Sequence, residues 1–308
     1  MKYIKYFIYI LPIIIFILVT TLKEESKGEL GSKSNPVKFY FTPSVDATRI
    51  TTNAKELVDF LQKETGYYFR TAVPSSFIAL VEAFGTDKVD IAGINTFSYL
   101  IAHKKYGAEA RLRIVREGDE TTYKGQILAR TGIGINSIKD LQGRSFAFVD
   151  PSSTSGYILP KALLKRNGIK PSEEVFAMKH ENVVTMIYQG QVDAGATYYA
   201  PPNHKTGEIM DARMRVEKQF PDVEKKVKII GFTEDIPNDP FVFRKNMPEK
   251  MKEKIINAFL KFVSTPEGQK ALFDIYDIVG LIPTKDSDYD NLRNMLKEQN
   301  ISLEGKIK

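Results

Sequence analysis

A run of three hydroxyl side chains and a glycine, Ser153-Thr154-Ser155-Gly156, is the feature of this sequence best suited to chemistry. It follows a strand-like apolar run, residues 145–149, and directly precedes a helical apolar run. The first turn of a helix has backbone N–H groups without partners in the helix and the positive end of the helix dipole. Hydroxyl groups add further donors there. The pattern predicts an oxyanion-binding site, although an ordinary helix cap also places Ser or Thr at this position.

Other kinds of chemistry are poorly supported. The chain has no cysteine, and its three histidines, His103, His180 and His204, lack the spacing of metal ligands. We therefore expect no metal and no cofactor. A catalytic triad can be assembled from Ser155, His180 and Asp193, but no nucleophile elbow surrounds the serine, and no phosphate loop with its lysine is present. We therefore expect a binding protein rather than an enzyme.

The composition is that of a folded protein with a mixed surface charge. Of 308 residues, 43% are hydrophobic and 27% are charged, which excludes wholesale disorder and a membrane protein of many spans. The net charge is +6, but 44 basic residues are dispersed among 38 acidic ones. Without a basic patch, nucleic acid is not expected as a partner.

The first 22 residues have the pattern of an export signal. Lys2 and Lys5 precede an almost unbroken apolar stretch, residues 6–19. This stretch is at the short end of what spans a bilayer and no small-residue cleavage triplet follows it, so both a cleaved signal and an uncleaved membrane anchor fit. Residues 23–36 have the composition of a polar tether. In either case the rest of the chain is predicted to work outside the cytoplasmic membrane, in the periplasm or on the membrane's outer face.

The remaining chain alternates short β-rich runs with amphipathic helical stretches, which is typical of an α/β protein with largely parallel sheets. The alternation stops at a glycine-rich passage, residues 131–135, and then restarts. The last helices, predicted between residues 251 and 276, have no strands of their own, so we expect them to pack on the first lobe. We predict one lobe from residues 37–128 and 241–308, a second from 129–240, and a ligand cleft between them.

Residues 150–157 resemble the Asp-Pro-x-Ser-Thr-Ser-Gly-aromatic signature of the phosphonate-, phosphite- and phosphate-binding proteins of ABC importers. Residues 89–92, 180–181, 192–193 and 237–240 resemble other motifs of that family in the same order. The resemblance covers nearly the whole chain after the tether. It implies a two-lobed type II periplasmic-binding-protein fold, a small phosphorus oxyanion as ligand, and an ABC permease with its ATPase subunit as partners. A membrane-tethered sensing module of the same fold, which signals to a partner protein, is the alternative.

The resemblance also implies which residues contact the ligand. In the family the Ser-Thr-Ser run grips the oxygens of the phosphonate, which carries over to Ser153, Thr154 and Ser155. Gly156 is included in the predicted site. His180 is implied as another contact to the oxyanion, either as a neutral donor or as an imidazolium. Tyr123 is implied as a hydroxyl donor from the first lobe.

One position departs from the family's pattern. Asp239 corresponds to an aspartate that acts with a glutamate to hold the amino group of aminoalkylphosphonates. The position of that glutamate falls on Tyr199 or Ala200, neither of which is an anion, and Tyr199 is included in the predicted site. A buried ammonium needs a paired charge, so a smaller oxyanion is expected, with Asp239 accepting a hydrogen bond from a protonated ligand oxygen.

A second departure concerns the first lobe, where the family often has an aromatic hydroxyl at a helix start. That position falls on Ser75, Ser76 or Phe77, and Ser76 and Phe77 are included in the predicted site. The serines also fit a helix cap, and Phe77 also fits a core residue.

Overall fold

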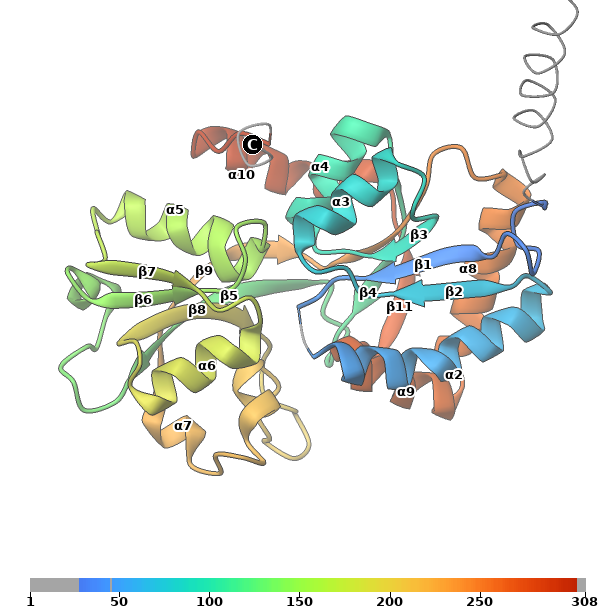
Figure 1. Ribbon diagram of the computed structural model, residues 1–308. Helices are drawn as coiled ribbons and strands as arrows, with labels where there is room; N and C mark the ends of the chain where they lie inside the picture. Colours follow the sequence, from blue (N-terminus) through green and yellow to red (C-terminus); the bar gives the residue numbers. More distant parts are fainter. Residues whose placement is uncertain (1–27, 45, 304–308) are drawn as a thin grey trace, which may run out of the picture.

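The computed structural model describes residues 28–44 and 46–303. This part of the chain forms two lobes side by side, each built on one β-sheet with helices on both faces (Figure 1). The expected signal or anchor, residues 1–22, lies outside the described residues, as does the start of the expected tether. Within the described ranges, no helix is long and apolar enough to cross a membrane.

The first lobe contains a six-stranded sheet in the order β11-β4-β10-β3-β1-β2. Its strands are β1 (Val37–Phe41), β2 (Phe69–Ala72), β3 (Ile91–Gly93), β4 (Glu109–Val115), β10 (Pro240–Phe243) and β11 (Gly280–Pro283). β1 pairs in parallel with β2 and β3, whereas β10 runs antiparallel between β3 and β4, and β11 is antiparallel to β4. The sheet is therefore mixed rather than largely parallel. The C-terminal part of the chain contributes two strands to it, not helices alone.

Helices cover both faces of this sheet (Figure 1). They are α2 (Ala47–Thr65), α3 (Phe77–Gly85), α4 (Thr96–Tyr106), α8 (Glu249–Val263), α9 (Pro266–Tyr276) and α10 (Asp290–Glu298), with a short 3-10 helix at Asp286–Tyr289. α2 buries Ile50, Ala54, Leu57 and Leu61, which recur every three or four residues and so form one apolar stripe. That stripe lies in the core shared with α8 and α9, while α3 and α4 pack together on the opposite face.

The second lobe contains a five-stranded sheet in the order β7-β6-β8-β5-β9. Its strands are β5 (Thr122–Arg130), β6 (Ser145–Phe148), β7 (Glu173–Phe176), β8 (Ala194–Tyr199) and β9 (Val227–Pro237). Its helices are α5 (Leu159–Arg166), α6 (His180–Gln189) and α7 (Val223–Lys226), with 3-10 helices at Ile138–Leu141 and Ala212–Val216 and a π-helical turn at Thr154–Ile158. Along β6, Phe146 and Phe148 belong to one apolar cluster and Ala147 to another, because successive side chains of a strand point to opposite faces.

The chain passes between the two sheets twice, between β4 and β5 and between β9 and β10. The sequence placed the first passage at residues 131–135, but β5 pairs with β8 and β9 and so already belongs to the second lobe. The first passage therefore lies at residues 116–121. The glycine-rich segment is a turn at the end of β5, where Gly132 and Gly134 have φ angles of 83° and 79°, which favour glycine.

Candidate functional site

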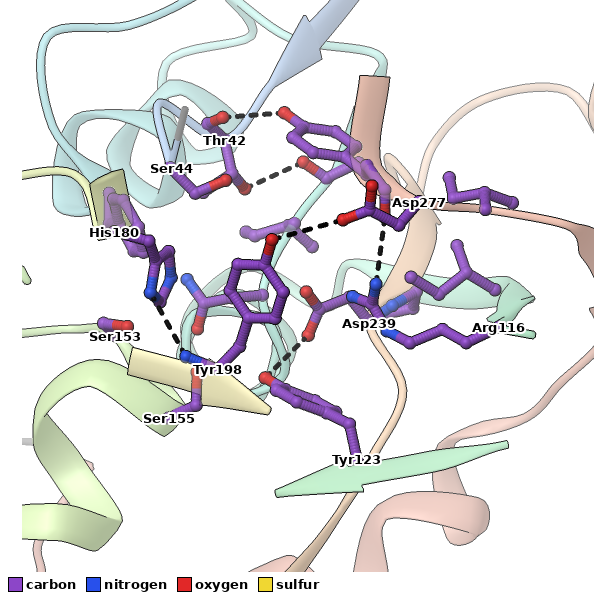
Figure 2. A pocket seen from close by; sticks show the side chains of 18 of the residues that line it. Thr42, Ser44, Arg116, Tyr123, Ser153, Ser155, His180, Tyr198, Asp239 and Asp277 are labelled. Carbon is purple, nitrogen blue, oxygen red and sulfur yellow. Dashed lines mark hydrogen bonds between the residues drawn. The ribbon is translucent and has the colours of Figure 1, made fainter. Parts of the chain in front are cut away.

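A cavity of about 60 Å³ lies between the lobes (Figure 2). A space of this size suits a small ligand. Polar side chains line it from both sheets and from both passages. They are Thr42, Ser44, Asn95, Arg116, Tyr123, Ser153, Ser155, His180, Tyr198, Arg215, Asp239, Tyr276 and Asp277.

Strand ends bring several of these residues together. Thr42 and Ser44 follow β1, Asn95 follows β3, and Arg116 follows β4. These three strands run in the same direction, so their carboxyl ends meet at one edge of the first sheet. Ligands of α/β proteins bind at such an edge. In the second lobe, Ser153 follows β6 in the same way.

The hydroxyl run forms a π-helical turn before α5, not the first turn of one continuous α-helix. The N–H of Ile158 donates to the carbonyl oxygen of Ser153 at 2.9 Å, five residues back. The hydroxyl of Ser153 accepts from the N–H of Gly156 at 3.1 Å. Ser153 and Ser155 line the cavity, so this turn presents its two serines to the space between the lobes.

Thr154, between the two serines, does not line the cavity. Its hydroxyl oxygen accepts from the N–H of Phe97 at 2.9 Å and donates to Oδ1 of Asn95 at 3.1 Å. Both partners belong to the first lobe, at the N-terminus of α4. The sequence placed Thr154 at the ligand, whereas in the structure its hydroxyl bonds to the opposite lobe.

His180 lines the cavity from the first residue of α6. Burial lowers its pKa from 6.5 to about 3, and the charges of Arg215 and Arg116 act in the same direction. Its Nδ1 faces the backbone N–H of Tyr198 at 3.3 Å (Figure 2) and therefore accepts. A neutral ring that accepts at Nδ1 carries its proton on Nε2. Of the two alternatives, the geometry favours a neutral donor.

The lowered pKa of His180 predicts that the protein loses stability in acid. A folded pKa of about 3 lies below the ordinary value of 6.5, so the unfolded chain binds a proton that the folded chain does not. This contribution to stability is complete above pH 6.5 and falls by about 1.4 kcal/mol per pH unit as the pH decreases toward 3. Urea unfolding at several pH values should show a shallower acid dependence for His180→Gln than for the unaltered protein. Equal slopes would show that His180 titrates normally.

Asp239 lies at the second passage between the lobes and faces the cavity. Its Oδ1 lies 3.1 Å from the N–H of Thr96 and 2.9 Å from the Thr96 hydroxyl. The same oxygen lies 3.4 Å from the Tyr123 hydroxyl (Figure 2). Burial raises the pKa of Asp239, while the charge of Arg116 and the bonds from Thr96 oppose that rise. Burial and the charge of Asp239 also raise the pKa of Tyr123 well above its usual value, so its hydroxyl stays protonated. Tyr123 belongs to β5 and so to the second lobe, not the first.

Arg116 is a cavity residue that the sequence reasoning missed. Its side chain is 8% exposed, donates through Nη1 to the carbonyl oxygen of Tyr276 at 3.0 Å, and lies over the rings of Tyr123 and Tyr198. Within residues 28–44 and 46–303 no carboxylate oxygen lies within 4 Å of it. A basic residue directly after a strand with an apolar buried face was the available signal.

A buried ion pair between the lobes was also missed. Nη2 of Arg215 lies 2.5 Å from Oδ2 of Asp277, and each side chain is 4% exposed. The hydroxyl of Tyr198 bonds to both residues. Arg215 comes from a 3-10 helix of the second lobe and Asp277 from the end of α9 in the first. Nothing in the local sequence of either residue indicates that they meet.

Tyr199 does not line the cavity, whereas the neighbouring Tyr198 does. Consecutive residues of β8 point to opposite faces of the sheet. Tyr199 packs against Phe232, with ring centres 4.7 Å apart. The cavity position that the sequence gave to Tyr199 therefore belongs to Tyr198.

Ser76 and Gly156 also lie away from the cavity lining. The hydroxyl of Ser76 accepts from the N–H of Ala79 at 3.2 Å and caps α3, whereas Phe77 lines the cavity. A Cβ at Gly156 would lie 2.4 Å from a methyl carbon of Val149. Glycine at this position therefore allows the π-helical turn to pack closely on the chain after β6.

Taken together, the cavity offers hydroxyl groups, a neutral imidazole N–H and a guanidinium, which are the donors that hold an anion. In the part of the chain that the structure describes, no group of three or more His, Asp or Glu side chains could hold a metal ion.

Comparison with known proteins points to one family. A family model described as "ABC transporter, phosphonate, periplasmic substrate-binding protein" matches residues 39–289. The chain is 24% identical over 275 residues to the phosphate-import protein PhnD of Mycolicibacterium smegmatis, with 82% of each chain covered. It is 25% identical over 219 residues to the phosphonates-binding periplasmic protein of Escherichia coli, with 69% of this chain and 62% of the relative covered.

Solved structures with the same fold include a component of a phosphonate transporter and a protein bound to methylphosphonate. A binding protein component of an ABC phosphonate transporter from Pseudomonas aeruginosa superposes with a TM-score of 0.76 at 20% identity, covering 86% of this chain and 87% of that one. PhnD1 from Prochlorococcus marinus, in complex with methylphosphonate, gives a TM-score of 0.72 at 17% identity, covering 86% of this chain and 98% of that one. The fold of the chain is therefore that of a two-lobed type II periplasmic binding protein, and the family match shows that the chain belongs to the periplasmic substrate-binding proteins of phosphonate ABC transporters.

Proposed function

We propose that the protein captures a small phosphorus oxyanion, either phosphate, phosphite or a small alkylphosphonate, between its lobes and delivers it to an ABC importer. As a member of its family, the chain is the substrate-binding component of a transporter that works outside the cytoplasmic membrane, and not an enzyme. The importer's permease and ATPase subunits are the implied partners. In this proposal residues 1–22 export the chain or anchor it to the membrane.

The convergence of donors on one small cavity is the observation that carries the proposal. Ser153 and Ser155 approach it from the π-helical turn, His180 carries its proton on Nε2, and Arg116 brings a positive charge. A tetrahedral anion has several acceptor oxygens directed away from one centre. It can therefore contact both lobes at once, and a ligand that does so favours the closed state.

The cavity supports a ligand without an amino group. Tyr198 occupies the cavity position at which the sequence reasoning sought a second carboxylate, and its hydroxyl already bonds to Asp277. Asp277 is in turn paired with Arg215. This leaves Asp239 to face the ligand, where it can accept a hydrogen bond from a protonated oxygen. The small volume also fits an anion the size of phosphate or methylphosphonate.

Thermal denaturation of the full-length protein with a panel of anions tests the proposal. Phosphate, phosphite or methylphosphonate, at about 100 times its dissociation constant, should raise the melting temperature by about 5 °C, because only the folded chain binds. Sodium chloride at equal ionic strength is the control. If no phosphorus oxyanion shifts the transition beyond the chloride control, the proposal is wrong.

A further inference from the structure

We propose that Thr154 is a positioning residue that couples ligand binding to lobe closure by capping α4 of the opposite lobe, without contacting the ligand. This inference rests on the proposed function, because it concerns how the same cavity closes. Thr154 differs from its neighbours Ser153 and Ser155 in the direction of its hydroxyl, which bonds to the first lobe and not to the cavity.

Three N–H groups at the N-terminus of α4 donate to acceptors in three different parts of the chain. The N–H of Thr96 donates to Asp239 at 3.1 Å, and that of Ser98 donates to Oδ1 of Asn95 at 3.1 Å. The N–H of Phe97 donates to the hydroxyl oxygen of Thr154 at 2.9 Å. First-turn N–H groups need such partners because the helix offers none. Only the acceptor for Phe97 comes from the second lobe.

The Thr154 hydroxyl also donates a hydrogen bond to the first lobe, so it is both an acceptor and a donor between the lobes. Oδ1 of Asn95 accepts it at 3.1 Å, and the Asn95 amide is held in that orientation because its Nδ2 donates to the Ser98 hydroxyl at 2.8 Å. Thr154, Asn95 and Ser98 are 1%, 6% and 0% exposed. Water therefore does not substitute for these bonds while the lobes are closed, and removing the hydroxyl would leave buried groups unpaired.

The covalent chain links this contact to the ligand. Ser153 and Ser155 line the cavity on either side of Thr154, and the π-helical turn fixes their relative directions through the bond from Ile158 to Ser153. An anion that holds the two serines therefore also holds Thr154 in the direction that meets α4. Closing the lobes then forms both hydrogen bonds of the Thr154 hydroxyl. These bonds stabilise the closed state and not the open state, which is what a residue that couples binding to closure must do.

The test is the affinity of Thr154→Val, a change that keeps the shape of the side chain and removes its hydroxyl. We expect about a tenfold loss for phosphate, phosphite and methylphosphonate alike, because the lost bonds are made to the protein and not to the ligand. The loss should arise mainly from faster ligand dissociation, since closure is what retains the ligand. Thr154→Ser, which keeps the hydroxyl, should retain the affinity of the unaltered protein.

Two matched variants separate coupling from stability and from direct contact. Thr197→Val removes another buried hydroxyl of the second lobe, one that bonds only within that lobe, to Gln126 and to the backbone of Tyr198. It should lower the free energy of unfolding and leave affinity unchanged. Ser155→Ala should weaken binding by a factor that differs between the three anions, because Ser155 faces the ligand.

Unchanged affinity in Thr154→Val, or a loss that differs between the anions as in Ser155→Ala, would overturn this inference and leave the proposed function intact. If the unaltered protein binds none of the three anions, the proposed function is wrong and the coupling role is lost with it. An equal loss of affinity for all three anions in Thr154→Val, together with full affinity in Thr154→Ser, supports both the proposed function and the coupling role.

Discussion

Replacing Arg116 by methionine is expected to weaken the binding of phosphate and methylphosphonate by about 100-fold, or about 2.7 kcal/mol. Arg116 lines the cavity, and no carboxylate oxygen of the described residues lies within 4 Å of its guanidinium. Its neighbours, the Tyr276 carbonyl and the rings of Tyr123 and Tyr198, leave its charge available to a bound anion. Methionine fills similar space without a charge. Isothermal titration calorimetry of the two proteins measures the difference.

Arg111→Met is the matched control. Arg111 lies on β4, the strand that directly precedes Arg116. Its side chain pairs with Glu109 and Glu249 outside the cavity. Its replacement should change affinity little, because ion pairs near the surface contribute weakly. If Arg116→Met binds phosphate as tightly as the unaltered protein, the anion does not sit beside Arg116, and the proposed arrangement of the site is wrong.

Replacing Asp239 by asparagine is expected to remove discrimination against sulfate. A carboxylate accepts hydrogen bonds and repels an anion that has no proton to give. Phosphate near neutral pH retains a proton for Asp239, whereas sulfate does not, so sulfate should bind the unaltered protein about 100-fold more weakly than phosphate. The asparagine amide is uncharged and has N–H donors, so sulfate should bind the variant more tightly and phosphate more weakly. Calorimetric competition between the two anions gives the ratio.

Asp193→Asn serves as the control for this charge change. Asp193 is in the second lobe, where it accepts hydrogen bonds from the backbone N–H and the hydroxyl of Ser145. Its replacement should reduce stability and leave the ratio of phosphate to sulfate binding as it was. Equal binding of both anions by the unaltered protein, or a ratio that Asp239→Asn leaves unchanged, would mean that Asp239 does not select the ligand by its proton.

The two-lobed α/β architecture could be predicted because alternating strands and helices leave a strong periodic pattern. The pattern missed β10 and β11, because both are antiparallel strands whose place in the first sheet depends on pairing with β4, which is far away in the sequence. It also placed the first passage after β5. The glycines at the end of β5 have the composition of a linker, but which sheet a strand joins depends on its pairing with distant strands.

The candidate site could be predicted where its residues belong to a recognisable local sequence motif. Ser153, Ser155, His180 and Asp239 lie in recognisable motifs, and all of them line the cavity. The direction of the Thr154 hydroxyl was not predictable, because it depends on a helix that precedes it by about 50 residues of chain. Arg215 and Asp277 reach the cavity through tertiary packing, which a single sequence does not encode locally.

The ion pair between Arg215 and Asp277 has a consequence for transport. Both charges are removed from water where the lobes meet, and that desolvation is compensated only when the two side chains face each other and share the Tyr198 hydroxyl. The pair therefore favours the one relative placement of the lobes in which these side chains meet. A permease that recognises the closed form would then receive the carrier in a single, defined docking geometry.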